Sequence, residues 1–274
     1  MDLFFFLLSA LAVSTAQVLM PVAILMIGLG AILKYYPLLG LSIFMFKPGR
    51  VLLTTLVSSV LIFGAYLAVT AQDLQVAWGS TQRGGDVAYG TQVLAMHFLS
   101  KPASPGVVAL SGPPISLAVA TGILYGLALL IVYAATWLAV RSPYQLVSSS
   151  QRNLAAFWMG ASIYVGTFFL GNNWSYRLAF LLFVIPQLGE WTRTLRRGGR
   201  LLTCTTMGLV LLTCWYLFFR NQISADWRES YFLFDQFLQW ALFGNLIYLF
   251  LASVPENIRA ALSLRSTQLS PSKA

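Results

Sequence analysis

The chain has 274 residues, of which 58% are hydrophobic and only 9% are charged, and its formal net charge is +9. Soluble globular domains carry about 25% charged residues, so this composition excludes an ordinary soluble domain. It predicts an all-α, polytopic integral membrane helical bundle, because long continuous apolar runs form helices in a bilayer. A transmembrane β-barrel would alternate polar and apolar positions, which these runs do not.

Successive apolar runs predict a single transmembrane domain over residues 1–274 with about seven or eight transmembrane helices. The runs cover residues 3–33, 51–70, 115–140, 154–170, 178–189, 201–219 and 235–253. The first run is longer than one crossing requires, and Pro21 is expected to kink it or divide it in two. The run 178–189 contains Pro186 and predicts a tilted or partly unwound helix. Residues 38–46 are too few to cross as an α-helix, which indicates an interfacial or re-entrant segment.

The basic residues set the expected orientation. If Lys34, Lys47 and Arg50 lie in the cytoplasm and each later run crosses once, 12 of the 17 Lys and Arg residues fall on the cytoplasmic side. The densest basic cluster, Arg193 to Arg200, is among them, as the positive-inside rule requires. The high net charge then reflects loops that contact membrane lipids, and no nucleic acid is expected as a partner. We expect the chain to lie in the bacterial cytoplasmic (inner) membrane.

Three polar loops fall on the outer side in this orientation, at 71–114, 171–177 and 220–234. Loops as long as 71–114 more often carry function than merely connect elements. The second loop is a polar septet, Gly171-Asn172-Asn173-Trp174-Ser175-Tyr176-Arg177, between two apolar runs. Hydrocarbon cannot satisfy amide, phenol and guanidinium groups, so these side chains must face water, protein or a polar ligand. The alternative is a short connecting loop at the membrane surface.

The sequence predicts neither a metal centre nor a cofactor. Cys204 and Cys214 lie in one apolar run, about 15 Å apart along a helix, which is too far for a disulfide between them. His97 has no cysteine or second histidine near it in the sequence, which argues against a zinc site. The sequence contains no glycine-rich phosphate loop and no nucleophile elbow.

Two stretches carry a resemblance to a known family. The first reads Ala31-Ile32-Leu33-Lys34-Tyr35-Tyr36-Pro37-Leu38-Leu39 and is followed by Lys47 to Arg50. It resembles the "lysine, aromatic pair, proline" segment of glycosyltransferase family 87, a family of polytopic enzymes of the GT-C class. The second, Asn172 to Arg177 and onward to Pro186, is similar to a segment in uncharacterised relatives of those enzymes. The resemblance covers residues 15–70 and 155–190, and it implies sugar transfer from a polyprenyl-phosphate donor on the outer side of the membrane.

The chain departs from this family in one respect. GT-C enzymes generally place a catalytic carboxylate in the first external loop, whereas Asp2 is the only acid before residue 73 here. We therefore expect a C-terminal part of such an enzyme or a shortened relative. The rival hypothesis is a non-catalytic subunit or scaffold whose partners are other membrane protein subunits. A transporter ranks last, because the centres of the runs contain almost no ionisable residues.

The candidate binding residues lie in the outer loops. Arg177 is the first candidate for a lipid phosphate, which a guanidinium group binds in bidentate fashion, and the alternative is an arginine that reaches lipid headgroups. Tyr176 and Asn173 are candidates for supporting a sugar or phosphate, or else they cap the loop. We expect Arg177 and Tyr176 to line an outward-opening polar pocket. His97 is a candidate for binding phosphate or moving a proton, with a solvated loop position as the alternative.

The candidate catalytic residues are Asp73 and Asp86, the only acids in the loop 71–114. Either carboxylate can act as the general base that deprotonates an acceptor hydroxyl. Asp73 comes first, because it closely follows the run 51–70 and a helix end would hold it at the membrane surface. Simple solvation is the alternative for both residues. Lys34 is interpreted as a topology anchor at the cytoplasmic boundary.

Overall fold

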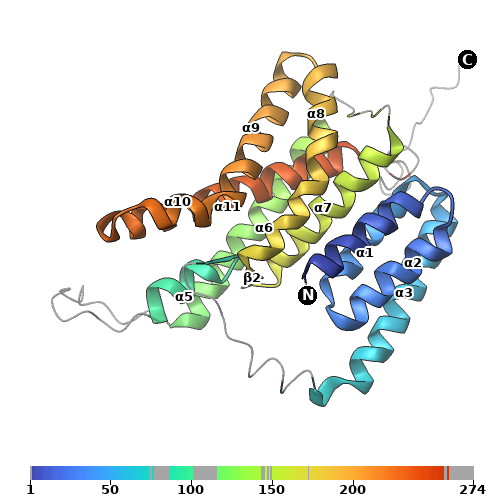
Figure 1. Ribbon diagram of the computed structural model, residues 1–274, viewed down its shortest axis with the longest axis horizontal. Helices are drawn as coiled ribbons and strands as arrows, with labels where there is room; N and C mark the ends of the chain where they lie inside the picture. The colour runs from blue at the N-terminus through green and yellow to red at the C-terminus, as the bar shows by residue number, and fades with distance from the viewer. Residues whose placement is uncertain are drawn as a thin grey trace, which may run out of the picture.

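The computed structural model describes residues 2–73, 87–100, 116–142, 150–171 and 173–255, together with residues 76, 146, 148 and 258. This part of the chain is almost entirely helical, with one pair of two-residue strands, which confirms the all-α fold (Figure 1). The elements in chain order are α1 (Asp2–Thr15), α2 (Met20–Leu33), the 3₁₀-helix η1 (Tyr36–Phe46), α3 (Gly49–Val69), β1 (Ala88–Tyr89), α5 (Val93–Ser100), α6 (Leu117–Arg141), α7 (Gln151–Phe169), β2 (Asn173–Trp174), the 3₁₀-helix η2 (Ser175–Val184), α8 (Ile185–Thr194), α9 (Arg197–Cys214), α10 (Tyr216–Gln222), η3 (Ala225–Trp227) and α11 (Arg228–Ala252).

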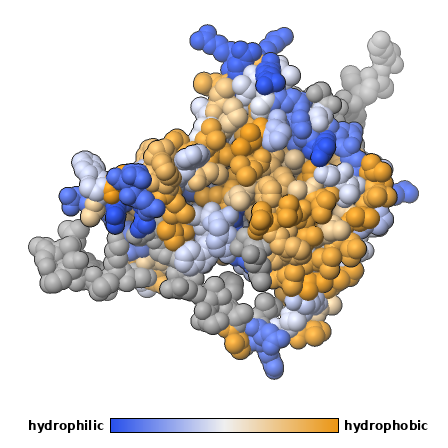
Figure 2. All heavy atoms as spheres, viewed as in Figure 1, coloured by the Kyte–Doolittle hydropathy of each residue, from blue (hydrophilic) through white to orange (hydrophobic). Residues whose placement is uncertain are grey.

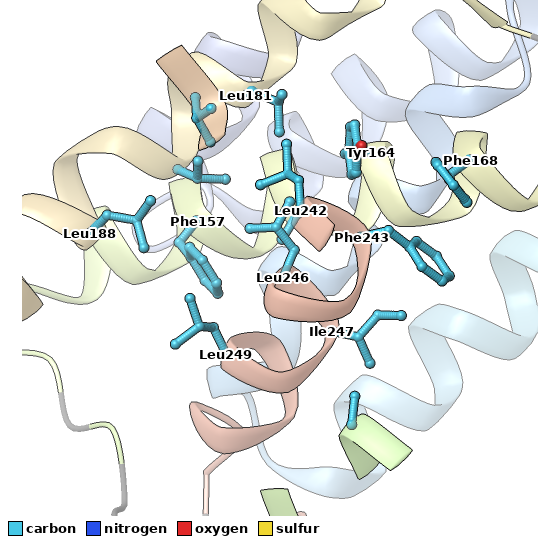
Figure 3. Close-up of a cluster of buried hydrophobic side chains, with 14 of the residues drawn as sticks. Phe157, Tyr164, Phe168, Leu181, Leu188, Leu242, Phe243, Leu246, Ile247 and Leu249 are labelled. Atoms are coloured by element: carbon cyan, nitrogen blue, oxygen red, sulfur yellow. The ribbon is translucent and has the colours of Figure 1, made fainter. Parts of the chain in front are cut away.

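Helix α7 lies at the centre of the bundle and contributes to both main hydrophobic clusters. On one side, its Phe157 and Phe168 pack with residues of α6, α8, α9 and α11 (Figure 3). On the other side, its Met159 and Ile163 pack with residues of α1, α2 and η1. In a bilayer such contacts stabilise the bundle through van der Waals packing rather than through removal of apolar surface from water. Elements from both halves of the sequence are therefore held against this one helix.

Two long 3₁₀-helices flank α7. Such helices rarely exceed three or four residues, yet η1 has 11 residues and η2 has 10. Every third residue from Pro37 to Ile43 is buried in η1, and every third residue from Leu178 to Val184 is buried in η2. A 3₁₀-helix has three residues per turn, so this spacing places the buried side chains in one row along its axis. The partly unwound helix expected over 178–189 is thus a 3₁₀-helix that continues into α8.

The first apolar run is divided into two helices at the place that Pro21 suggested. Pro21 lies in the first turn of α2, where its missing N–H costs no helical hydrogen bond. α1 and α2 pack against each other as a hairpin (Figure 1). Arg152, in the first turn of α7, donates from Nη2 to Ser14 Oγ at 3.2 Å, so α1 ends beside the start of α7. α2 then returns to the end of the bundle at which α7 finishes.

The segment η1 differs from the expectation for residues 38–46. It packs along α7 as a 3₁₀-helix, where Ser42 Oγ donates to the Trp158 carbonyl at 3.0 Å and lies 2.9 Å from Ser162 Oγ. A 3₁₀-helix rises about 2.0 Å per residue, so η1 is about 22 Å long and reaches most of the length of α7. Lys34 and Lys47 therefore lie at opposite ends of the bundle. The orientation expected from the sequence placed both lysines on the cytoplasmic side of the membrane.

Among the described residues, α3 and α6 are long and apolar enough to cross a membrane, and the bent pair α9–α10 is a third candidate if its two parts form one span. This finding fits an integral membrane protein, but it does not confirm the expected seven or eight spans. α9 and α10 meet at an angle of 54°. Apolar surface covers the side formed by α1, α2 and α3, whereas hydrophilic residues gather at the turn between α8 and α9 (Figure 2).

Candidate functional site

The septet 171–177 is held by residues of the long loop 71–114. Ala88 and Tyr89 pair antiparallel with Trp174 and Asn173, and the Val87 carbonyl accepts hydrogen bonds from the backbone N–H and the hydroxyl of Ser175 at 3.1 and 2.7 Å. The septet and this part of the loop thus lie together, at the end of the bundle where α7 finishes. We call this end of the bundle the septet end.

Two glycines allow the two loops to meet. Gly90 has φ of +126° and Gly171 has φ of +107°, which are values that L side chains rarely adopt. A Cβ atom on Gly90 would lie 1.8 Å from the Gly171 carbonyl oxygen, so any larger residue at position 90 would push the loops apart. The contact between the loops therefore depends on glycine at both positions.

Asn173 positions Arg177. The Asn173 side chain is buried; its Nδ2 donates to the Thr167 carbonyl and its Oδ1 accepts a hydrogen bond from Arg177 Nη1. The guanidinium carbon of Arg177 lies 5.0 Å from the ring centroid of Tyr36 and 5.8 Å from that of Tyr176. Arg177 Nε is buried and makes no hydrogen bond, which leaves one donor of the guanidinium group unused. No carboxylate oxygen of the described residues lies within ion-pair distance of Arg177.

Lys34 joins Arg177 at the septet end. Its ammonium nitrogen lies 5.4 Å from the ring centroid of Tyr176 and 5.3 Å from that of Phe5. Cation–π contacts of this length are worth about 0.5–1 kcal/mol at exposed positions and more in desolvated ones. Lys34, Tyr36, Asn173, Tyr176 and Arg177 therefore form one group, which we call the Lys34–Arg177 cluster. The sequence suggested three of its members as site residues and missed the roles of Lys34 and Tyr36.

Tyr89 lies behind this cluster and connects it to the core. Burial raises the pKa of Tyr89 to about 12, against the opposing effects of its hydrogen bond to Thr167 and of the Arg177 charge. The phenol is therefore neutral at physiological pH, and its oxygen lies 2.9 Å from Thr167 Oγ1. Its ring stacks on that of Tyr164 in α7 with a centroid separation of 5.5 Å. The two stacked tyrosine rings that join the cluster to α7 are thus firmly packed and uncharged.

A groove of about 460 Å³ borders the cluster at Tyr176. Its walls come from η2, α9 and α10 and are mostly apolar, with Leu178, Leu182 and Leu217 among them. Tyr176 lines this groove and Arg177 does not, so the polar pocket expected to be lined by both residues stays a prediction. The arrangement is instead a cationic and aromatic cluster beside an apolar groove.

The other candidate residues lie apart from this cluster. Asp73 is in helical conformation just beyond α3 with an exposed side chain, and Asp86 lies outside the described residues. His97 is not in a solvated loop: it is a buried residue of α5, its Nε2 lies 2.7 Å from Glu229 Oε1, and its ring stacks on Phe232 at 4.0 Å. This histidine fastens α5 to the start of α11.

Among the described residues, no three His, Cys, Asp or Glu side chains lie together so that they could hold a metal ion. Cys204 and Cys214 are both free thiols. Comparison of the chain with protein families, with curated proteins and with solved structures finds no match.

Proposed function

We propose that the Lys34–Arg177 cluster binds the phosphate of a lipid-linked sugar at the membrane surface, and that the protein is a GT-C-like glycosyltransferase or a shortened relative of one. The observation that carries this proposal is the meeting of two distant segments. Lys34 to Pro37 resembles a segment of glycosyltransferase family 87, Asn173 to Arg177 resembles a segment of uncharacterised relatives of those enzymes, and Arg177 lies against the ring of Tyr36.

The chemistry of the cluster suits a phosphate monoester or diester. A lysine ammonium group and an arginine guanidinium group supply two positive charges, and the buried Arg177 Nε supplies an unused donor. Guanidinium binds phosphate oxygens through paired N–H groups, and the partial burial of Arg177 strengthens such bonds. The apolar groove beside Tyr176 suits the hydrocarbon chain of the same ligand.

In this proposal the septet end faces away from the cytoplasm. The basic cluster Arg193 to Arg200 spans the end of α8 and the start of α9 at the other end, where the positive-inside rule places it on the cytoplasmic side. The bundle has about seven or eight spans, of which α3 and α6 are the most clearly defined by length and hydropathy. The proposed location is the bacterial inner membrane.

Sugar transfer requires a general base, and Asp73 and Asp86 are the proposed candidates. Asp73 lies one helical turn beyond the end of α3. The test is sugar transfer by the purified protein with polyprenyl-phosphate-linked donors, comparing the wild type with Asp73→Asn and Asp86→Asn. Loss of a positioned general base lowers the rate by about 10²–10⁴. Wild-type activity that survives both substitutions would remove these acids from the mechanism.

The second candidate function is a non-catalytic subunit, and the surface of α3 favours it. None of the residues of this 21-residue apolar helix is buried. A helix that α2 and η1 cover only in part can pack on another membrane protein as well as on lipid. A stoichiometric partner that protects α3 from labelling at Ser58→Cys, combined with no sugar transfer from a broad panel of donors and acceptors, would favour the subunit.

A further inference from the structure

A buried carboxyl group lies outside the Lys34–Arg177 cluster. Asp235, in the second turn of α11, is 3% exposed, and its Oδ1 atom makes no hydrogen bond. No Lys, Arg or His nitrogen of the described residues lies within ion-pair distance of it. Burial of a carboxylate without a positive partner is costly, so a ligand that supplies one would be bound favourably.

Asp235 forms part of the wall of a cavity of about 270 Å³ between α11 and the bent α9–α10 pair. Three aromatic side chains, Phe219, Tyr231 and Phe234, share this wall with the amide of Gln222. The rest of the lining is aliphatic. The cavity therefore combines one carboxyl group with several aromatic rings.

Neighbouring glutamine side chains position the carboxyl group of Asp235. Gln236, the next residue in α11, donates from Nε2 to Asp235 Oδ2 at 3.5 Å, and Gln239 lies one turn further along the same helix. The Gln239 side chain is itself held, because its Oε1 accepts a hydrogen bond of 2.7 Å from the hydroxyl of Tyr164 in α7. A carboxyl group held in this way needs little reorganisation when a ligand binds.

The residues that line this cavity favour some classes of ligand over others. A carboxylate repels phosphate and other anions, and a divalent metal ion requires more oxygen ligands than one carboxyl and one amide group. An ammonium group matches both features, because it pairs with carboxylate and binds over aromatic faces. We propose that this cavity binds the ammonium group of an amine, carried either by a lipid headgroup or by a small free amine.

The test uses the full-length protein in detergent and two amine ligands, short-chain phosphatidylethanolamine and free ethylammonium. Short-chain phosphatidylglycerol, which has no amine, is the lipid control, and thermal unfolding reports binding. The key variant is Asp235→Asn, which keeps the shape of the side chain but cannot carry a negative charge. The matched control is Asp226→Asn, the same change at an exposed position of η3.

We expect an amine ligand to stabilise the wild type and Asp226→Asn, and to bind Asp235→Asn at least about tenfold more weakly, because the charge-assisted contact is lost. Stabilisation by phosphatidylethanolamine alone would identify a lipid headgroup as the source, and stabilisation by both ligands would identify the free amine as sufficient. Phe219→Leu, at a partly exposed ring, should weaken binding about fivefold without changing the carboxyl group. Equal binding by wild type and Asp235→Asn, or no stabilisation of the wild type by either amine, would overturn the proposal.

Discussion

The ammonium group of Lys34 lies 5.4 Å from the ring centroid of Tyr176, although Lys34 follows α2 and Tyr176 lies in η2. This relationship brings the segment that begins at Lys34 and the segment that ends at Arg177 to one end of the bundle. It also sets Lys34 apart from Lys47, because η1 runs between these two lysines. The proposed ligand site depends on this contact.

Cysteine labelling from the two sides of the membrane tests whether Lys34 and Lys47 lie on opposite sides. In a background that carries Cys204→Ala and Cys214→Ala, Lys34→Cys should react from the same side as Trp174→Cys. Lys47→Cys should react from the opposite side, together with Arg197→Cys. Reaction of positions 34 and 47 from one side would contradict the path of η1 along α7.

Replacement of Asn173 by alanine should destabilise the septet end. The buried amide hydrogen-bonds to the Thr167 carbonyl and to Arg177, and its removal leaves both groups without that partner. The expected cost is about 1–3 kcal/mol, measured as a lower thermal unfolding temperature. Asn221→Ala, at an exposed position of α10, is the control and should have little effect. Equal shifts in the two variants would mean that Asn173 does not hold the loop.

Gly160→Ala should separate η2 from α7. A Cβ atom at position 160 would lie 2.7 Å from the Phe180 carbonyl oxygen, and a backbone atom cannot rotate away. The expected loss of stability is about 1–3 kcal/mol. Gly189→Ala is the matched control in α8, where an added Cβ meets nothing within 4 Å, and it should stabilise the helix by up to about 1 kcal/mol. Shifts of the same sign in the two variants would contradict the close packing at Gly160.

Much of the fold follows from the sequence, because long apolar runs predict helices and Pro21 predicts the division of the first run. The path of residues 36–46 does not follow from counting residues for an α-helix. A 3₁₀-helix rises about 2.0 Å per residue rather than 1.5 Å, so a segment too short to cross as an α-helix reaches further. The signal was present in the three-residue spacing of Pro37, Gly40 and Ile43.

The candidate site could be predicted only in part for a similar reason. Asn173 and Arg177 stand four residues apart in one polar septet, and their local contact is visible in the sequence. The contacts of Arg177 with Tyr36 and of Lys34 with Tyr176 are tertiary, and no local pattern indicates them. The buried position of Asp235 depends on α9, α10 and α7, so the sequence showed it only as an acid at the edge of an apolar run.

His97→Ala should loosen α5 from the bundle. The substitution removes both the contact with Glu229 and the stacking on Phe232. The expected cost is about 2 kcal/mol, and amide hydrogen exchange in residues 93–100 should become faster, because this opening is local. Phe98→Ala, at the neighbouring exposed position, is the control. Unchanged exchange in the His97 variant would show that other contacts hold α5.

Binding of polyprenyl phosphate to the purified protein tests the proposed role of the Lys34–Arg177 cluster most directly. Wild type should bind polyprenyl phosphate more tightly than polyprenol, which has the same chain without the phosphate. Arg177→Lys keeps the charge but loses the planar fork, so it should weaken binding of the phosphate about tenfold, whereas Arg193→Lys at the opposite end should not. Equal binding of polyprenol and polyprenyl phosphate by the wild type, or equal binding of the phosphate by wild type and Arg177→Lys, would contradict the proposed site.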